Sequence, residues 1–294
     1  MLLLISDAFD PSLKDLLSTF GEVTEDKGRV SEADVVLVRS KTKCTKEYID
    51  SAKNLKLIIR GGVGIDNIDS AYAASKGIIV RNTPKSSAIA VAELAFALML
   101  SVPTNLIAMH NGMKEGQWLK KMKRTELYGK TLALFGIGNI ASMVAVRAQA
   151  FGMNVIAYDK YVTESAVATM VPTLEDAVRE ADYISMHLPL TDETRGVFNE
   201  KLIGACTKKP VVINTGRGPC VDADAMKKAL EEGSISWYAT DVYPSDPPSP
   251  DYPLLASDRV TLTPHVGANS VENLLRIGDE ATAIIKELID GGKI

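Results

Sequence analysis

The sequence predicts an α/β protein with two domains, each built on a parallel sheet that helices cover on both faces. Short runs of β-branched and other apolar residues alternate with helix-length segments along the chain, which is the pattern of doubly wound sheets. The alternation pauses after residue 86 and begins again at Thr131. A length of 294 residues also favours two domains of ordinary size over a single core.

The first unit is predicted from four apolar runs and from the segments between them. Stretches such as Ser12–Phe20 and Lys46–Ala52 have the length and the apolar spacing of helices. The predicted strands are Leu2–Ile5, Val35–Val38, Leu57–Ile59 and Ile78–Val80.

The segment from Ser86 to Glu115 is expected to join the domains. Ala88–Leu100 is rich in good helix formers, and Pro103 follows, so a long helix is expected to break or kink there. Apolar residues at helical spacing from Val271 to Ile289 predict a closing helix. The second unit has runs for a six- or seven-stranded sheet: Thr131–Phe135, Val155–Tyr158, Tyr183–Met186, Val211–Asn214, Tyr238–Val242 and Val260–Leu262.

The composition predicts a soluble globular protein without a nucleic-acid or membrane partner. Hydrophobic residues make up 46% and charged residues 24%, and the net charge is -4. Such a mildly acidic chain has no field that would hold nucleic acid or an anionic membrane surface. The apolar start meets Asp7 without basic flanking residues, so it is a strand rather than a signal peptide.

The cysteines predict reduced thiols in the cytoplasm. Cys44, Cys206 and Cys220 are far apart, odd in number and lack CxxC spacing. Neither a disulfide framework nor a metal site is therefore expected.

A glycine turn between a predicted strand and a predicted helix indicates a dinucleotide site. Gly136, Gly138 and Ala141 follow the strand directly, and residues 142–151 suit a helix. The first glycine permits the turn, the second lets a pyrophosphate approach, and the third position needs only a small residue. The alternative is a glycine turn that binds no ligand.

An acidic residue ends the next strand. Asp159 stands eighteen positions beyond Ala141, where a carboxylate can accept hydrogen bonds from the adenosine ribose and repel a 2′-phosphate. NAD is therefore predicted over NADP, although Lys160 next to it can soften that discrimination.

Three residues that follow predicted strands of the second unit form a candidate catalytic set. The guanidinium of Arg217 can hold a carboxylate through two parallel hydrogen bonds. His265 can exchange a proton near neutral pH, and Asp246 can orient it. The alternatives are a structural histidine and a turn aspartate beside prolines. His110 is expected on the surface, and His187 beside the cofactor.

Several segments together resemble the D-isomer-specific 2-hydroxyacid dehydrogenases, and the match covers nearly the whole chain. They are residues 57–69, 82–84, 129–132, 151–159, 187–190, 213–218, 241–243 and 263–268.

The resemblance implies a Rossmann NAD-binding domain inserted in a flavodoxin-like substrate-binding domain. We expect residues 1–98 and 269–294 to form the substrate domain and residues 99–268 to form the NAD domain. The family's Arg–acid–His set falls on Arg217, Asp246 and His265. Family members are usually dimers or larger, so a homodimer or a higher homo-oligomer that contacts through residues 86–115 is expected.

The resemblance also implies the residues that bind the cofactor and the substrate. The substrate set is Arg60, Gly61, Gly62, Val63 and Asn82. The cofactor set is Gly136, Gly138, Asn139, Ile140, Asp159, His187, Pro189, Thr215, Asp241 and Thr83.

Three positions depart from the family pattern, and the third, Ala141 in the glycine turn, is tolerated because a small residue is enough there. The acid is Asp246 where the family normally has Glu, so its side chain is one methylene shorter. Asn139 stands where the family commonly has Arg, which removes a donor from the glycine turn.

Details near Arg60 and Trp118 look most like the members that interconvert D-3-phosphoglycerate and 3-phosphohydroxypyruvate, the first step of serine biosynthesis. Arg60 suits a phosphate, and the basic cluster Lys120, Lys121, Lys123 and Arg124 either reaches an anionic substrate or is a solvated patch.

Three expectations about function remain beside this one. A glyoxylate or hydroxypyruvate reductase, or another D-2-hydroxyacid dehydrogenase, shares the same machinery and is the alternative enzyme. A more distant alternative is an NAD-sensing, corepressor-like binding protein. The chain stops at Ile294 directly after the closing helix, so a C-terminal regulatory domain is not expected.

Overall fold

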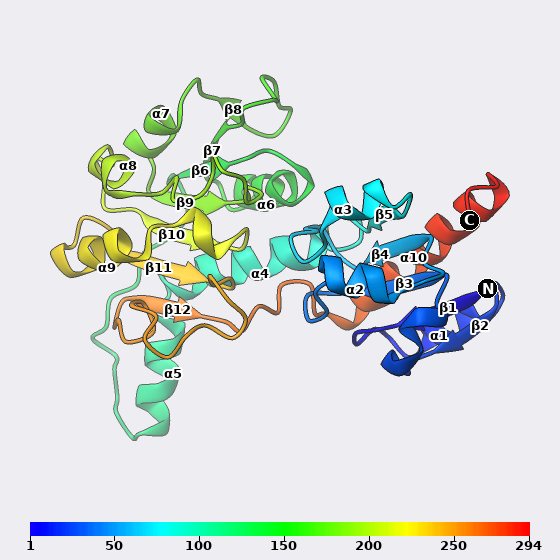
Figure 1. Ribbon diagram of the computed structural model, residues 1–294. Helices are drawn as coiled ribbons and strands as arrows, with labels where there is room; N and C mark the ends of the chain where they lie inside the picture. The colour runs from blue at the N-terminus through cyan, green and yellow to red at the C-terminus, as the bar shows by residue number, and fades with distance from the viewer. The chain divides into compact units, whose positions relative to one another are not determined.

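The structure, a computed structural model, describes all residues 1–294 and divides into two compact units (Figure 1). Unit 1 comprises Met1–Ala90 and Ala268–Ile294, and unit 2 comprises Val91–Gly267. The expected boundaries lay after residues 98 and 268. Each unit is a parallel sheet with helices, so the predicted fold class is confirmed.

Unit 1 contains a five-stranded sheet in the order β2-β1-β3-β4-β5, with every pair parallel. This is the flavodoxin-like strand order. In the β4–β5 register Arg60 lies opposite Asn82, so the last residues of these strands are neighbours. The strands are β1 (Leu2–Ile5), β2 (Glu22–Thr24), β3 (Val35–Val38), β4 (Leu57–Arg60) and β5 (Ile79–Asn82).

Helices cover both faces of this sheet. Two of them pack against each other on one face, where Leu13 and Leu17 meet Ala281 and Ile285 in one apolar cluster. The other face carries a 3-10 helix and two short helices. The first pair is α1 (Ser12–Leu17) and α10 (Val271–Asp290); the second group is Lys27–Glu32, α2 (Lys46–Ser51) and α3 (Ser70–Ser75).

Unit 2 contains a seven-stranded parallel sheet in the order β12-β11-β10-β9-β6-β7-β8. The order reverses between β6 and β9, and ligands of such sheets bind beyond the carboxyl ends of the strands at this point. The strands are β6 (Thr131–Phe135), β7 (Asn154–Tyr158), β8 (Thr169–Met170), β9 (Tyr183–Met186), β10 (Val211–Asn214), β11 (Trp237–Thr240) and β12 (Val260–Leu262).

Two apolar clusters fill the faces of the second sheet. One joins the sheet to two helices, and the other joins it to three helices that lie together on the opposite face (Figure 1). The first two are α4 (Ala88–Ser101) and α6 (Asn139–Ala150), and the three are α7 (Leu174–Arg179), α8 (Glu200–Gly204) and α9 (Ala223–Glu232). The sheet is thus buried on both faces, as parallel sheets usually are.

The helix predicted to break near Pro103 does so. The chain passes from unit 1 to unit 2 within α4, and α5 (Leu106–Lys114) follows at an angle of 66°. Asn105, just before α5, adopts the left-handed conformation with φ 52°. No single helix has the length and apolar character to span a membrane; only the bent pair α4 and α5, taken together, has them.

The differences from the predicted elements are local. The short strands β2 and β8 were not predicted, because two or three residues carry no periodic signal. Helix α6 begins at Asn139 rather than near residue 142, so the glycine turn leads straight into the helix. Strand β11 ends at Thr240, two residues earlier than expected, which leaves Asp241 in the loop beyond it.

Candidate active site

The glycine turn forms an open approach to the amino end of α6. Gly136 has φ 87°, and a Cβ there would lie 3.2 Å from the carbonyl oxygen of His187, so a side chain is excluded on two grounds. Gly138 is exposed, and nothing lies within 4 Å of where its Cβ would be. Because no side chain caps α6, its first amide groups remain available to an anion.

Asp159, directly after β7, forms a hydrogen bond with the backbone of the glycine turn. Its Oδ2 accepts from the amide of Ile137 at 3.0 Å, and its Oδ1 accepts from Tyr161 at 2.8 Å and Val162 at 3.1 Å. A carboxylate has about four acceptor sites, so one remains for a ribose hydroxyl. The structure therefore adds a structural role to the one predicted from sequence.

Lys160, which could offset the charge of Asp159, is engaged elsewhere. Its Nζ lies 2.7 Å from Oε1 of Glu193, and this ion pair is exposed on both sides. The lysine thus has a carboxylate partner of its own.

Two polar side chains of the predicted cofactor set follow adjacent strands. The β9–β10 register pairs Asn214 with Met186, so Thr215 and His187 take the next position on the same face. Nε2 of His187 lies 2.9 Å from the hydroxyl of Ser185, whereas the buried Nδ1 of His187 and the buried Oγ1 of Thr215 have no hydrogen-bond partner. Burial lowers the pKa of His187 to about 4, so the ring is neutral at physiological pH.

These residues fit a dinucleotide. The uncapped helix start and the open Gly138 suit a pyrophosphate. The remaining acceptor site of Asp159 suits a ribose, and unpartnered polar atoms follow β9 and β10.

The predicted catalytic residues follow three neighbouring strands of unit 2. Arg217 follows β10, Asp246 lies in the loop after β11, and His265 comes three residues after β12. Because β10, β11 and β12 are adjacent and parallel, their carboxyl ends share one edge of the sheet. The fold brings the three residues to this edge from positions 48 residues apart in the chain.

Asp246 and His265 are in direct contact. Oδ2 of Asp246 and Nδ1 of His265 are joined by a short hydrogen bond. Both side chains are partly exposed, at 45% for Asp246 and 34% for His265. With Nδ1 taken by the carboxylate, Nε2 is the ring nitrogen that can exchange a proton with a substrate.

The backbone at His265 is held in an uncommon conformation. Its φ is 53°, which for a residue other than glycine costs on the order of 1 to 3 kcal/mol and is maintained only by surrounding contacts. These come from Asp241, whose carboxylate accepts from the amides of Val266 at 2.9 Å and Gly267 at 2.8 Å. Asp241, predicted for the cofactor, thus also contacts the histidine loop.

Arg217 is the N-cap of a 3-10 helix, Gly218–Cys220, and is half-buried. Its Nη1 donates to the carbonyl of Gly216 at 2.8 Å, and its own carbonyl accepts from Nδ2 of Asn214 at 3.0 Å. The guanidinium is therefore anchored to the turn after β10. This anchoring limits the positions that its fork can take.

The predicted substrate residues lie together in unit 1, at the carboxyl ends of β4 and β5 and in the loop after β4. A Cβ at Gly62, where φ is 137°, would lie 1.6 Å from Nη1 of Arg60, so the guanidinium occupies the space that the glycine leaves. Thr83, predicted for the cofactor, is buried here and accepts from the amide of Gly62 at 2.7 Å. Asn82 donates to the carbonyl of Val63 at 2.5 Å. Asn82 and Thr83 thus shape the loop that holds Arg60.

Arg39, a second arginine at this edge of the unit 1 sheet, was not among the predicted site residues. Arg39 follows β3 at the same edge of the sheet as Arg60. Its guanidinium donates to the carbonyls of Ala8 at 3.3 Å and Ala268 at 3.2 Å, and burial lowers its pKa. Its place directly after a predicted strand, as for Arg60, is the signal that could have found it.

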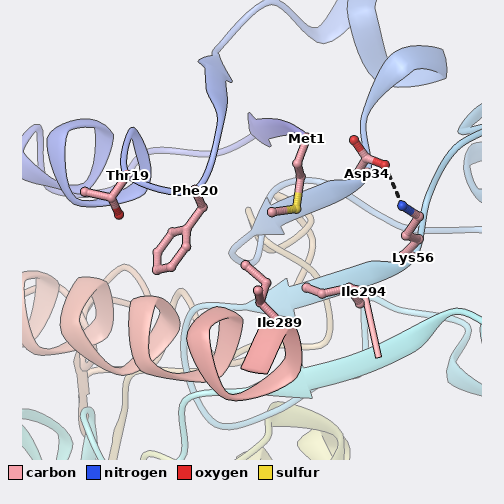
Figure 2. Close-up of a pocket in the computed structure, with 7 residues that line it drawn as sticks. All are labelled: Met1, Thr19, Phe20, Asp34, Lys56, Ile289 and Ile294. Carbon is pink, nitrogen blue, oxygen red and sulfur yellow. Dashed lines mark ion pairs between the residues drawn. The ribbon is translucent and has the colours of Figure 1, made fainter. Parts of the chain in front are cut away.

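A cavity of about 420 Å³ lies at the opposite edge of the unit 1 sheet. Met1, Asp34 and Lys56 precede β1, β3 and β4, so the cavity is at the amino ends of these strands, away from Arg60. Figure 2 shows the ion pair of Asp34 and Lys56 on one side and apolar side chains around the rest. It takes no part in the predicted chemistry. The lining residues are Met1, Thr19, Phe20, Asp34, Lys56, Ile289 and Ile294.

The family is shown by comparison with known proteins. Residues 96–267 match the model of the D-isomer specific 2-hydroxyacid dehydrogenase NAD-binding domain. The chain belongs to this family. The matched segment contains the glycine turn, Asp159 and all three catalytic candidates, so NAD is the cofactor that this domain is built to bind.

Two curated relatives and one solved structure illustrate the similarity. The chain is 40% identical to D-3-phosphoglycerate dehydrogenase of Methanocaldococcus jannaschii over 98% of its own length and 57% of the relative. It is 43% identical to hydroxypyruvate reductase of Thermotoga maritima over 88% of its length and 86% of the relative. D-lactate dehydrogenase of Aquifex aeolicus, solved with NAD and lactic acid, superposes with a TM-score of 0.88 at 29% identity, covering 100% of this chain and 97% of that one.

The chain spans about half the length of several curated relatives that it matches, from 45% to 57% of each.

Proposed function

We propose that this protein is an NAD-dependent dehydrogenase that interconverts D-3-phosphoglycerate and 3-phosphohydroxypyruvate. The hydrogen bond between Asp246 and His265 carries the proposal, because it leaves a histidine nitrogen for proton transfer at the sheet edge that Arg217 shares.

His265 exchanges the proton of the reaction. In the oxidative direction its Nε2 takes the proton of the C2 hydroxyl; NAD, when bound, would supply the acceptor for the hydride of C2. The imidazolium that results lies against the carboxylate of Asp246, which stabilises it. In the reductive direction the imidazolium returns the proton to the carbonyl oxygen.

Arg217 orients the substrate. A planar guanidinium grips a carboxylate through two parallel hydrogen bonds, and its anchoring to Gly216 directs that fork. Fixing the carboxylate fixes C2, which must present its hydrogen to the nicotinamide.

Arg60 supports a phosphorylated substrate. Its guanidinium lies over Gly62 in a loop that Asn82 and Thr83 hold, and guanidinium groups bind phosphate well. Gly61, Gly62 and Val63 then contribute the backbone of this loop. The relatives named D-3-phosphoglycerate dehydrogenase support the same choice.

The cofactor residues have separate proposed tasks. Gly136, Gly138, Asn139 and Ile140 present the turn and the start of α6 to the pyrophosphate. Asp159 binds the adenosine ribose and disfavours NADP, since Lys160 is paired with Glu193. We assign the nicotinamide half to the residues that follow β9, β10 and β11: His187, Pro189, Thr215 and Asp241.

A hydroxypyruvate reductase is the second candidate. The Thermotoga maritima relative is 43% identical, and the match covers 86% of its length. The proton relay and the carboxylate clamp serve that reaction equally well, so the two candidates differ only in the role of Arg60.

A homodimer is also proposed. Helix α5 and the segment after it carry large apolar side chains that are exposed to solvent. Leu106 is 62% exposed and Trp118 is 75% exposed. Exposed apolar patches of this kind commonly mark protein contacts. Light scattering on the purified protein should give twice 31.7 kDa, and a monomer at micromolar concentration would contradict this.

The substrate is tested by following NADH oxidation with phosphohydroxypyruvate, hydroxypyruvate, glyoxylate and pyruvate, with NADPH as the cofactor control. A preference for phosphohydroxypyruvate supports the proposal. Turnover of only the unphosphorylated acids would support the reductase instead, and no turnover of any of the four would favour a binding protein.

A further inference from the structure

Asp241 touches three groups of the loop that carries His265. Its Oδ1 accepts from the amide of Val266 at 2.9 Å and from the hydroxyl of Thr263 at 2.7 Å. Its Oδ2 accepts from the amide of Gly267 at 2.8 Å. The residue is 2% exposed, so these bonds form out of water, where they direct geometry strongly.

The absence of a side chain at Gly267 lets the loop lie close to this carboxylate. A Cβ at Gly267 would lie 3.0 Å from Oδ2 of Asp241. The amides of Val266 and Gly267 therefore converge on one carboxylate. The left-handed conformation of a non-glycine residue costs free energy, and these hydrogen bonds offset that cost for His265.

A second contact comes from the same segment after β11. The hydroxyl of Tyr243 donates to the carbonyl of Thr263 at 2.8 Å, and the amide of His265 donates to that carbonyl at 3.0 Å. Asp246, three residues further on, bonds the imidazole itself. One short segment thus holds the histidine by its backbone and by its ring.

We propose that Asp241 and Tyr243 are positioning residues, which hold His265 with φ 53° and so keep its Nδ1 against Asp246. The effect of this role on catalysis rests on the proposed function. The role goes beyond the cofactor contact assigned to Asp241. The carboxylate has about four acceptor sites and uses three on the loop, so one remains for the cofactor.

The variants are chosen to separate the two roles of Asp241. Thr263→Val removes one bond to the carboxylate at nearly constant volume, and Thr263→Ser keeps the hydroxyl as the matched control. Tyr243→Phe removes only the bond to the Thr263 carbonyl. Asp241→Asn replaces one of the two carboxylate oxygens by an NH₂ group. This group cannot accept a hydrogen bond from the amide that faces it, whether that of Val266 or that of Gly267.

Two readouts do not depend on turnover. Amide hydrogen exchange of residues 263–268 reports the backbone, and ¹⁵N spectra of labelled histidine report the ring tautomer. The chain has three histidines, so His110→Gln and His187→Gln spectra assign the signal of His265. We expect the wild type to hold the Nδ1–H tautomer of His265. We expect Thr263→Val and Asp241→Asn to speed amide exchange at Val266 and Gly267 and to populate the Nε2–H tautomer as well.

Steady-state kinetics test whether the positioning of His265 affects turnover. We expect Thr263→Val to lower kcat by about 10-fold and Asp241→Asn by about 100-fold, since small displacements of a catalytic group have effects of this size. Thr263→Ser should stay within about 2-fold of wild type. NADH affinity, measured by fluorescence, should be unchanged in Thr263→Val and Tyr243→Phe.

Several results would overturn the proposal. Wild-type exchange rates and tautomer in Asp241→Asn would show that the carboxylate does not hold the loop. Faster exchange in Thr263→Val with unchanged kcat and pH profile would leave only a structural role. A wild-type protein that turns over none of the four acids would remove the proposed function, whereas the exchange and tautomer data would still decide whether Asp241 holds His265.

Discussion

Asp246 bonds Nδ1 of His265 although its side chain is one methylene shorter than the glutamate expected from the family resemblance. The loop after β11 reaches far enough for the shorter acid to make the contact. The pair is therefore complete as it stands, and its energetic value can be measured by changing the acid alone.

For Asp246→Asn we expect kcat to fall on the order of 10²- to 10⁴-fold, because an amide neither selects the Nδ1–H tautomer nor stabilises the imidazolium. Asp246→Glu, which keeps the charge, should recover a substantial part of the activity. Steady-state kinetics over pH 6 to 9 measures both. Equal activity of the Asn and Glu variants would show that the charge at this position is not used.

Arg217→Lys should lower kcat/KM about 100-fold or more although the charge is retained, since one ammonium cannot form both parallel bonds to a carboxylate. NADH affinity should hardly change, and it is measured by fluorescence quenching on the same preparation. Arg195→Lys, an exposed arginine of the same unit, is the matched control. Kinetics like those of the wild type would exclude Arg217 from the carboxylate site.

Arg60→Ala should weaken turnover of phosphohydroxypyruvate by about 10- to 100-fold and leave hydroxypyruvate within about 3-fold, because only the first substrate carries a phosphate for the guanidinium to bind. The ratio of the two kcat/KM values is the measurement. A loss of the same size for both acids would mean that Arg60 shapes the loop around Gly62 without contacting phosphate.

His187 makes stability depend on pH in a defined direction. Burial lowers its pKa to about 4 in the folded protein, against about 6.5 in the unfolded chain, so between these values the unfolded state binds more protons. The stability from neutral His187 is therefore full above pH 6.5 and is lost as the pH falls toward 4. At pH 5 the loss is about 2 kcal/mol.

Urea unfolding at pH 7.5 and pH 5 of the wild type and His187→Gln measures this component, because the variant should lose less stability on acidification. His110→Gln, which changes an exposed histidine of α5, should behave like the wild type. A wild type and a His187→Gln variant with the same pH dependence would refute the assignment.

The larger elements could be predicted because each has its own periodic signal. Thr131–Phe135, Tyr183–Met186 and Val211–Asn214 were predicted with the bounds that the structure has, since central parallel strands are continuous apolar runs. Short edge strands such as β8 gain little from burial and show no such run. The helix break after α4 followed from Pro103 alone.

The sequence predicted which residues form the candidate site but not which of their atoms are in contact. Sequence placed Arg217, Asp246 and His265 after strands, yet only the fold shows which atoms of Asp246 and His265 meet. The bonds of Asp241 to the loop around His265 join residues 22 to 26 positions apart, and no local pattern encodes such pairs. The positive φ of His265 is likewise set by these distant partners.

We propose that His265 transfers the proton of the reaction while cofactor binding depends on other residues. The most direct test compares the wild type and His265→Ala in single-turnover NADH oxidation with phosphohydroxypyruvate and in NADH binding by fluorescence. For His265→Ala we expect a rate lower by about 10²- to 10⁴-fold with an unchanged dissociation constant for NADH. A variant that keeps the wild-type rate, or one whose rate falls only because NADH no longer binds, would contradict it.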